Sequence, residues 1–174
     1  MELRIRTAIL DDLPAALELY ADARRFMAEN GNPDQWGASN YPPESMLRDD
    51  VAQQTLYVAF DANSTDDTDM LAVFCFAVID DETYHKIDGA WLNDEPYGVV
   101  HRIATKLGSR GAGRACMQWC INKAATDGLG GGIRIDTHEA NKPMQGLVKK
   151  LGFTTCGTIW TYDGSPRIAF QLLS

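Results

Sequence analysis

The sequence predicts a single mixed α/β domain over residues 1–174, and three observations carry this prediction. Strand-like and helix-like patterns alternate along the chain, and no internal repeat or linker interrupts them. Two early strands flank a short acidic turn, which indicates an antiparallel hairpin, whereas the later half repeats a strand–helix–strand order. A chain of 174 residues with 45% hydrophobic and 23% charged residues can bury one sizeable core.

The first segment predicts a strand and a helix. Residues 3–9, LRIRTAI, alternate apolar and polar side chains and are typical of an edge strand. Pro14 stands near the start of the next run of apolar residues, which predicts a helix that continues to about Glu29. Asp11 or Asp12 is expected to cap this helix, because a carboxylate accepts hydrogen bonds from the unpaired N–H groups of a first turn.

A long loop and a hairpin follow. The loop NGNPDQWGASNYPP contains Trp36 and Tyr41, large aromatic residues that either pin it to the core or line a substrate site. A short helix is expected at residues 44–53. The strands TLYVAF and MLAVFCFAVI then enclose the acidic turn DANSTDDTD.

The second half is expected to begin with an irregular acidic stretch, residues 80–96. YGVVHRIAT, at residues 97–105, predicts a strand, and the helix that follows its loop is expected to end near Thr126. The remaining elements are, in order, the strand IRIDTH, the helix KPMQGLVKKL with Pro143 near its start, and the strands GFTTCGTIW and RIAFQLL.

Charge is unevenly divided along the chain. Residues 1–95 carry 20 Asp and Glu against 6 Lys and Arg, whereas residues 96–174 carry 4 against 10. No acidic residue occurs from Pro96 to Thr126. An acidic chain with one basic segment argues against a nucleic-acid partner. It fits a compact polyanion that is bound locally, with acidic surface left for a cationic molecule.

The other compositional features point to a cytoplasmic protein without a metal. Arg and Asp within residues 1–14 leave no apolar core for a signal peptide, and no apolar run of 18 residues occurs, so we expect no membrane partner. Four cysteines are too few and too scattered for a disulfide framework. Cys116 and Cys120 share one helix face, where we expect core packing because no second Cys or His pair stands near them.

The stretch SRGAGRAC, residues 109–116, stands at the mouth of a predicted helix. A helix N-terminus exposes unpaired N–H groups and the positive end of the helix dipole, and small residues let a phosphate approach them. The stretch therefore predicts a site for a pyrophosphate-sized anion. Its residues are the small Gly111, Ala112, Gly113 and Ala115 and the cationic Arg110 and Arg114.

A dinucleotide-binding loop is a competing interpretation. The spacing Gly111-x-Gly113-x-x-Cys116 lacks the third glycine of that fingerprint, although Asp136 does end the next strand as the fold requires. Thr105 lies six residues before the first glycine, too far for a turn directly after a strand. Only 38 residues follow Asp136, too few for a doubly wound sheet, so a dinucleotide-dependent oxidoreductase is the weaker alternative.

RGAGRA resembles the R/Q-x-x-G-x-G/A acetyl-CoA motif of the GNAT N-acetyltransferases. The resemblance covers nearly the whole chain: IRTAILDDLPAALELY is similar to the family's first strand and helix, HRIAT to its fourth strand, and NKPMQGLVKKLGF to its segment that ends in Gly-Phe. It implies a mixed sheet that splays between strands four and five, with the pantetheine arm of acetyl-CoA in that gap.

The resemblance also implies a reaction and its site. The protein would move acetyl from acetyl-CoA to a primary amine, on a small molecule or a peptide, by direct attack on the thioester. Homodimers are compatible with it. The residues that would hold acetyl-CoA are Arg110, Gly111, Ala112, Gly113, Arg114 and Ala115 for the pyrophosphate, with Ile103, Ala104, Thr105 and Asn141 for the pantetheine arm. Asn141 also fits a helix N-cap, and the two roles are compatible.

The catalytic groups are less well defined. Val148 occupies the position where the family often has a Tyr as general acid, so a CoA-binding module without turnover is an alternative function. The possible substitutes for that acid are Tyr57, Tyr97 and Tyr162. The candidates for the general base are His101, on the same strand face as Val99 and Ile103, and Glu95 and His138. Arg102 is expected to pair with Asp136.

Overall fold

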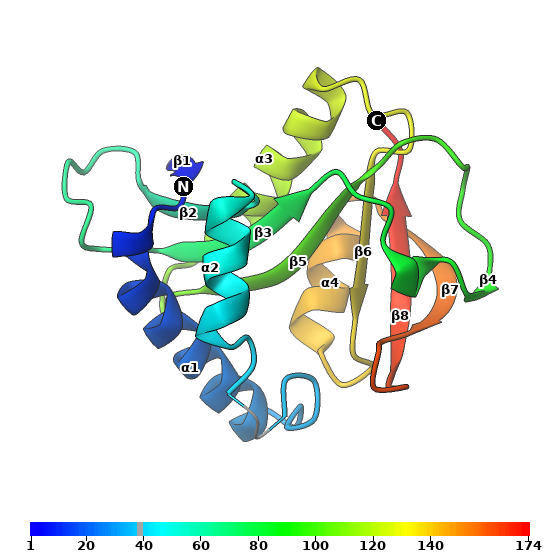
Figure 1. Cartoon of the computed structure of the whole chain (residues 1–174), viewed down its shortest axis with the longest axis horizontal. Helices are drawn as coiled ribbons and strands as arrows, with labels where there is room; N and C mark the ends of the chain where they lie inside the picture. Colours follow the sequence, from blue (N-terminus) through cyan, green and yellow to red (C-terminus); the bar gives the residue numbers. More distant parts are fainter. Residues whose placement is uncertain (38–39) are drawn as a thin grey trace. The chain divides into compact units, whose positions relative to one another are not determined.

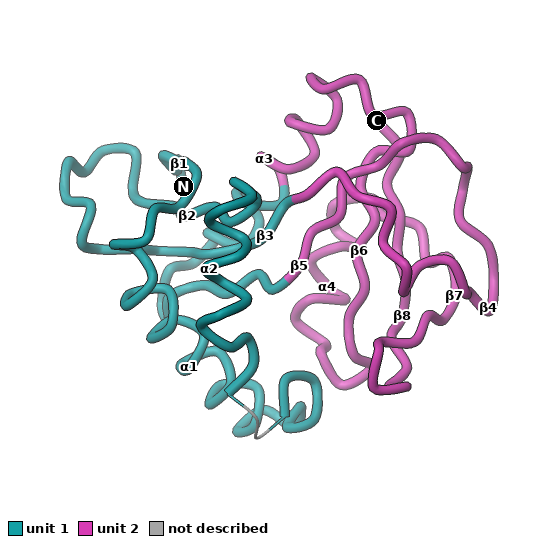
Figure 2. Tube along the Cα trace, viewed as in Figure 1, with its two compact units in different colours: residues 1–76, 102–117 teal, residues 77–101, 118–174 magenta. Residues whose placement is uncertain are grey.

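The computed structural model describes residues 1–37 and 40–174. The chain forms two compact units: residues 1–76 and 102–117 make unit 1, and residues 77–101 and 118–174 make unit 2 (Figure 2). The strands follow the order β1-β2-β3-β5-β6-β8-β7-β4, with both parallel and antiparallel neighbours. This confirms the predicted mixed α/β fold, while the single domain stays a prediction.

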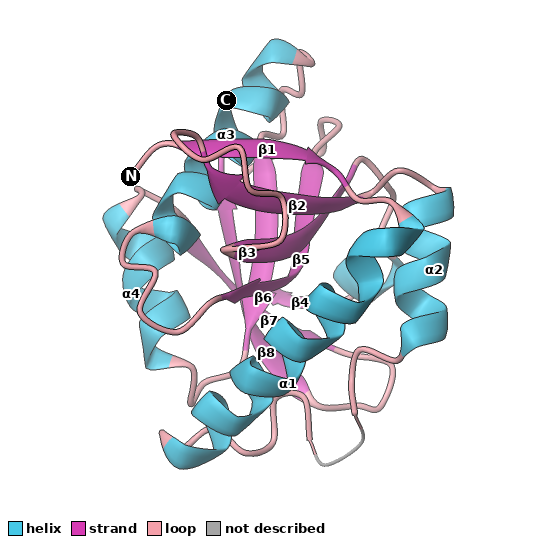
Figure 3. Cartoon of the chain, turned by 90° about the vertical axis from the view of Figure 1, so that its left-hand side faces the viewer, coloured by secondary structure: helices cyan, strands magenta, loops and turns pink. Residues whose placement is uncertain are grey.

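Unit 1 is built on the antiparallel strands β1, β2 and β3 and two helices (Figures 1 and 3). Its elements are β1 (Leu3–Thr7), α1 (Leu13–Glu29), α2 (Glu44–Ala52), β2 (Leu56–Asp61) and all of β3 (Ala72–Ala77) except its last residue. Leu56, Val58 and Phe60 alternate along β2 and pack in one core cluster with Tyr20 of α1 and Leu47 of α2. The hairpin predicted from the acidic turn is therefore confirmed, and its apolar face is buried by the helices.

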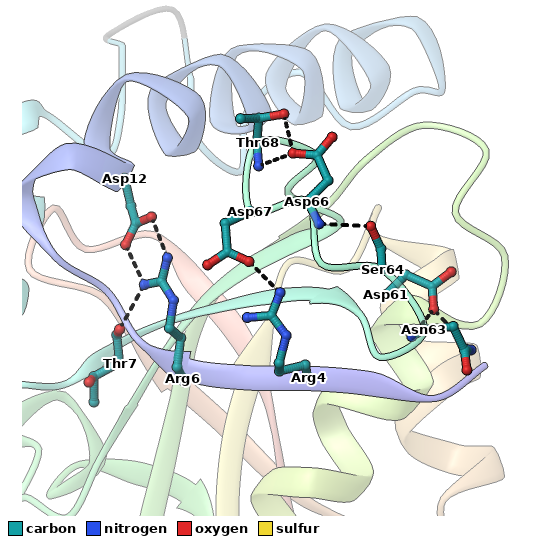
Figure 4. Close-up of polar contacts among 10 residues, drawn as sticks. All are labelled: Arg4, Arg6, Thr7, Asp12, Asp61, Asn63, Ser64, Asp66, Asp67 and Thr68. Atoms are coloured by element: carbon teal, nitrogen blue, oxygen red, sulfur yellow. Dashed lines mark hydrogen bonds and ion pairs between the residues drawn. The ribbon is translucent and has the colours of Figure 1, made fainter.

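The connection from β1 to α1 is held by one ion pair. The Arg6 guanidinium donates to both oxygens of Asp12, at 2.7 and 2.9 Å (Figure 4). The Ile9 N–H donates to the same carboxylate at 2.8 Å. Asp12 directly precedes α1 but makes no side-chain cap. The expected side-chain cap of α1 is therefore not formed by Asp12, because its carboxylate is bound by Arg6 of β1 and by the Ile9 N–H.

Unit 2 holds most of the later strands. Its elements are the short 3-10 helix η2 (Glu82–Tyr84), β4 (Ile87–Gly89), β6 (Ile133–Thr137), α4 (Lys142–Lys150), β7 (Thr154–Trp160) and β8 (Pro166–Leu172). Two further elements, β5 (Gly98–Thr105) and α3 (Ala112–Thr126), begin in one unit and end in the other. The core of unit 2 contains Tyr84, Val99, Cys156, Ile159 and Ala169.

The stretch expected to be irregular contains a strand. β4 pairs antiparallel with β7, and Gly89 lies opposite Gly157. A Cβ on Gly89 would lie 2.1 Å from the Cys156 carbonyl oxygen, and one on Gly157 would lie 2.1 Å from the Asp88 carbonyl oxygen. The sequence does not reveal this strand, because three residues show no periodicity and the pairing depends on two glycines at close backbone approach.

The parallel pairing of β5 with β6 is short. Its register contains only Gly98 with Ile133 and Val99 with Arg134, although β5 continues to Thr105. Because β4 is an additional strand, β5 and β6 correspond to the fourth and fifth strands of the resemblance. Pairing confined to the start of both strands is what the predicted splay requires of them.

All four cysteines are buried and form no disulfide bond, and Cys116 and Cys120 lie in the core as expected. Burial raises the pKa of Cys75 to about 11 and that of Cys116 to about 12, so both thiols stay protonated at neutral pH. Over residues 1–37 and 40–174, none of the helices combines the length and the apolar character needed to cross a membrane.

We predict that Gly157→Ala lowers the free energy of unfolding by about 2–4 kcal/mol, because its φ of +150° and the nearby carbonyl oxygen exclude a side chain. Gly146→Ala is the matched control in unit 2. It lies in α4 with open space around it, so the same change should stabilise the protein by about 0.5–1 kcal/mol. Urea denaturation measures both, and equal stabilities would contradict the close approach of β4 and β7.

Candidate functional site

The loop before α3 has the geometry of an anion site. Gly108 and Gly111 adopt φ values of +85° and +90°, which favour glycine, and they turn the chain from β5 into the helix. Gly111, Arg110 and Arg114 are exposed, and Gly113 is half-buried. The α3 helix begins at Ala112, so the small residues of the motif lie at its start.

The N–H groups at this helix start are only partly used. The Ala112 N–H donates to the Ser109 carbonyl at 3.1 Å, and the Ala115 N–H donates to the Gly111 carbonyl at 2.9 Å. Among the described residues, no acceptor is found for the N–H groups of Gly111, Gly113 and Arg114. These donors, together with two exposed guanidinium groups, fit a bound diphosphate, because the helix dipole adds positive potential at the same point.

The strand that leads to this loop contains an unusual residue. Arg102 has a φ of +52°, a left-handed conformation that is uncommon outside glycine. Its guanidinium donates to Asp50 of α2 at 2.6 Å, and both side chains are largely buried. The expected pairing of Arg102 with Asp136 is therefore wrong: the left-handed turn directs the side chain to α2, within unit 1. The next residues, Ile103–Thr105, follow this turn.

One of the three candidate bases is held by a carboxylate. His101 lies in β5, and its Nε2 is 2.8 Å from Oδ2 of Asp81 in unit 2. The other oxygen, Oδ1, accepts from the Thr83 N–H at 2.9 Å and from the Thr83 hydroxyl at 2.6 Å. The Asp81 side chain is only 9% exposed, against 25% for His101. The carboxylate is thus fixed at both oxygens, one of which faces the imidazole.

The charge state of Asp81 follows from these contacts. Burial raises its pKa, but the hydrogen bonds from His101 and Thr83 outweigh burial and bring it down to about 2. Asp81 is therefore ionised at neutral pH and can only accept, so Nε2 of His101 must carry the proton between them. The other ring nitrogen, Nδ1, has no hydrogen-bond partner among the described residues.

Tyr84 lies beside this pair. Its hydroxyl donates to Asp136 at 2.8 Å, and its ring centre is 6.2 Å from that of His101. Burial, and then the Asp136 charge, raise the pKa of Tyr84 well above its usual value. Tyr84 therefore remains a neutral phenol whose hydroxyl donates to the Asp136 carboxylate.

The other two candidate bases lie elsewhere in unit 2. His138 follows β6, and its Nδ1 accepts the Ala140 N–H at 3.1 Å at the entrance to α4. Glu95 is exposed and lies on the turn after α3, where a Cβ on Gly130 would lie 3.4 Å from the Glu95 side chain. Neither residue contacts a second charged side chain in the described structure, unlike His101.

Asn141 is the N-cap of α4, because its side-chain oxygen accepts the Met144 N–H at 3.1 Å. The capping interpretation is confirmed, and its role toward pantetheine stays a prediction. Val148 is fully buried, and valine has no hydroxyl that could act as an acid at that position. Of the tyrosines considered as acids, Tyr162 is 83% exposed, whereas Tyr97 lies against Arg134, with the guanidinium 3.8 Å from its ring centre.

Sequence reasoning missed Asp81. It lies 20 residues before His101 in the stretch expected to be irregular. The only local signal is the Asp-x-Thr spacing of Asp81 and Thr83, which favours a turn with the side chain bonded to the backbone two residues on. That spacing predicts the turn, but it does not predict that the other carboxylate oxygen, Oδ2, contacts His101.

Comparisons with known proteins identify a family and its fold. Residues 13–153 match the model of the acetyltransferase (GNAT) family. The GNAT acetyltransferase of Streptococcus agalactiae is 28% identical, with a TM-score of 0.80 over 99% of this chain and 95% of that one. The ribosomal-protein-S18-alanine N-acetyltransferase of Escherichia coli is 17% identical, with a TM-score of 0.64 over 99% and 94%, and it shows the fold alone. Comparison with curated proteins gives no match.

The fold and the matched residues define a GNAT-type acetyltransferase. The family model covers most of the chain, so this protein belongs to the GNAT acetyltransferase family. The resemblance seen in the sequence is confirmed at this level.

We predict that Asp81 contributes stability that acid removes. Because its pKa is about 2 in the folded protein, below the ordinary value of 3.8, its contribution is present above pH 4 and is lost as the pH falls from about 4 to 2. Between pH 5 and pH 2, wild type should lose about 1–2 kcal/mol more unfolding free energy than Asp81→Asn, after allowance for solvent screening. Urea denaturation at both pH values measures this, and parallel losses would contradict the pairing.

Proposed function

We propose that this protein transfers the acetyl group of acetyl-CoA to a primary amine, with His101 as the general base. The observation that carries the proposal is the set of three unpaired N–H groups between two exposed arginines at the start of α3. The NatC complex, whose structure contains CoA and a Gag peptide, aligns with this chain at 13% identity and a TM-score of 0.63. That similarity supports the fold required for CoA binding, and the loop supplies the donors.

The loop would hold acetyl-CoA by its diphosphate. N–H groups of Gly111, Gly113 and Arg114 would donate to phosphate oxygens, and Arg110 and Arg114 would add charge-assisted hydrogen bonds. Ala112, at the helix start, and Ala115, one turn on, are small enough to leave the approach open. The backbone of Ile103, Ala104 and Thr105 and the Asn141 side chain would contact the pantetheine arm.

The proposed reaction needs only acetyl-CoA and the amine as substrates. The amine lone pair forms a bond to the thioester carbonyl carbon, and the carbonyl π electrons move to oxygen. A proton of the attacking nitrogen passes to Nδ1 of His101, which later returns it to solvent. Collapse of the oxyanion breaks the C–S bond, and the electron pair leaves on sulfur. A thiol of pKa about 8.5 makes this leaving group acceptable without a dedicated acid, and water supplies its proton.

His101 is the best of the three candidate bases. Its Nδ1 is unpaired among the described residues while Nε2–H is bound to Asp81, so a lone pair is available for a proton. The Nδ1 lone pair of His138 already accepts a hydrogen bond from the Ala140 N–H. The Glu95 side chain packs against the turn at Gly130. A general base contributes about 10²–10⁴-fold to such a reaction.

The acceptor is proposed to be cationic before it loses its proton. The acidic excess of residues 1–95 attracts an ammonium group, whether it belongs to a small molecule or to a peptide N-terminus. We propose no nucleic-acid partner, and the cytoplasm is the proposed location.

A CoA-binding module without turnover is the second candidate, and the buried Val148 favours it. Release of free CoA separates the two functions. Purified protein is mixed with acetyl-CoA and, in turn, a polyamine, an aminoglycoside, a free amino acid and a peptide with a free N-terminus. An enzyme releases CoA with at least one of them, whereas a binding module releases none.

We predict micromolar binding of acetyl-CoA in isothermal titration, weakened at least about tenfold in the double variant Arg110→Ala/Arg114→Ala. Arg48→Ala is the matched control, since Arg48 is also exposed in unit 1 but pairs with Glu44. It should leave the dissociation constant unchanged. Absence of binding by wild type at millimolar acetyl-CoA would overturn the proposal.

A further inference from the structure

We propose that Asp81 is a positioning residue that sets the proton arrangement of His101. This inference rests on the proposed function for its effect on rate, but its structural part is independent of it. The structure places a fixed carboxylate against Nε2, and this leaves Nδ1 as the nitrogen that accepts a proton.

The Asp81 carboxylate is held in one orientation by its neighbours. Both Thr83 donors are used on Oδ1, so this oxygen cannot rotate toward the imidazole without losing two hydrogen bonds. The same carboxylate is the N-cap of η2, so the short helix holds it in place. A weak contact of 3.4 Å from the Asp81 N–H to the Tyr97 hydroxyl adds to this. Oδ2 is therefore presented to His101 by the backbone of residues 81–84.

Few charged side chains surround the pair of His101 and Asp81. Among the described residues, no Lys or Arg side chain contacts Asp81: Arg102 is bound to Asp50, and Arg134 lies over Tyr97. The ionisable groups nearest the pair are those of Tyr84 and Tyr97 beside it, Asp136 behind Tyr84, and Glu82 and Tyr162 near Asp81. His101 is thus the side chain that donates a hydrogen bond to Oδ2 of Asp81.

A neighbouring pair supplies a control. His85 Nε2 lies 2.6 Å from Oδ1 of Asp80, one residue before Asp81. Both side chains of that pair are exposed, at 58% and 79%, and Asp80 lacks the Thr83 contacts. An exposed pair of this kind contributes little, because solvent screens it and neither partner is fixed. The same substitution at the two adjacent aspartates therefore separates the positioning role from a general loss of charge.

Asp81→Asn should move the imidazole proton of His101 from Nε2 to Nδ1. The two Thr83 donors require an oxygen, so the amide oxygen takes the place of Oδ1 and the amide NH₂ group faces His101. Nε2 must then accept, and the ring proton moves to Nδ1. In that tautomer the nitrogen needed as base has no lone pair available.

The spectroscopic test is independent of activity. Nitrogen-15 NMR of ring-labelled histidine reports which nitrogen carries the proton, and His101→Gln identifies the His101 signals. We expect Nε2–H in wild type and in Asp80→Asn, and Nδ1–H in Asp81→Asn. Wild type with Nδ1–H would overturn the proposal. If Asp81→Asn fails to fold, as judged by circular dichroism, the wild-type tautomer alone decides.

The kinetic test uses the fastest amine of the panel described above. Asp81→Asn should lower kcat/KM for the amine by about 10²–10⁴-fold, with acetyl-CoA affinity within about twofold of wild type. Asp80→Asn should match wild type, and Asp81→Glu, which keeps the carboxylate, should recover at least about tenfold over Asp81→Asn. The double variant Asp81→Asn/His101→Gln should be no slower than His101→Gln alone, since the two residues act as one unit.

The outcomes separate this inference from the proposed function. An active wild type whose Asp81→Asn and Asp80→Asn variants behave alike would overturn the positioning role and leave the acetyltransferase in place. A wild type that binds acetyl-CoA but acetylates no amine would overturn the proposed reaction, and the NMR result would then decide the structural part.

Discussion

The constraint on which both candidate sites depend is the left-handed turn at Arg102. A non-glycine residue at a φ of +52° costs about 1–3 kcal/mol, so a compensating interaction must hold it. The buried ion pair with Asp50 provides that interaction, and loss of either partner would leave an uncompensated charge. His101 stands immediately before the turn, and Ile103–Thr105 immediately after.

Two kinds of electrostatic design serve the two chemical tasks. At the start of α3, the proposed anion would be bound by the backbone. The N–H groups and the helix dipole that would receive it are part of the helix itself, so their geometry does not depend on side-chain conformation. At His101, charge is held by a side chain that is itself fixed by Thr83. Binding of a flexible diphosphate tolerates small displacements, whereas proton transfer needs one nitrogen with a free lone pair, so the second site needs more support around it.

Periodicity and end signals account for most of the predicted fold. YGVVHRIAT gave β5, and the small residues after it gave the start of α3, because both patterns are local. The failures have non-local causes. β4 depends on a carbonyl oxygen 2.1 Å from the position of an absent Cβ, and Arg102 faces Asp50 because of a single dihedral angle. Asp81 meets His101 across 20 residues. The loop before α3 could be predicted because its signals are local, as those of the helices are. His101 could be named only as one of three candidate bases, and its partner Asp81 could not be predicted at all.

The burial of the cysteines has a practical consequence for enzymology. Thiol reagents react with thiolates, and the Cys75 and Cys116 sulfurs remain protonated, with pKa values of about 11 and 12. Burial also raises the pKa of Cys156. The native protein should therefore add little background colour to a continuous disulfide-exchange assay, and the signal would follow coenzyme released in solution. A late rise in that background would indicate that the protein is unfolding and exposing its cysteines. One assay would then monitor both turnover and the folded state of the enzyme.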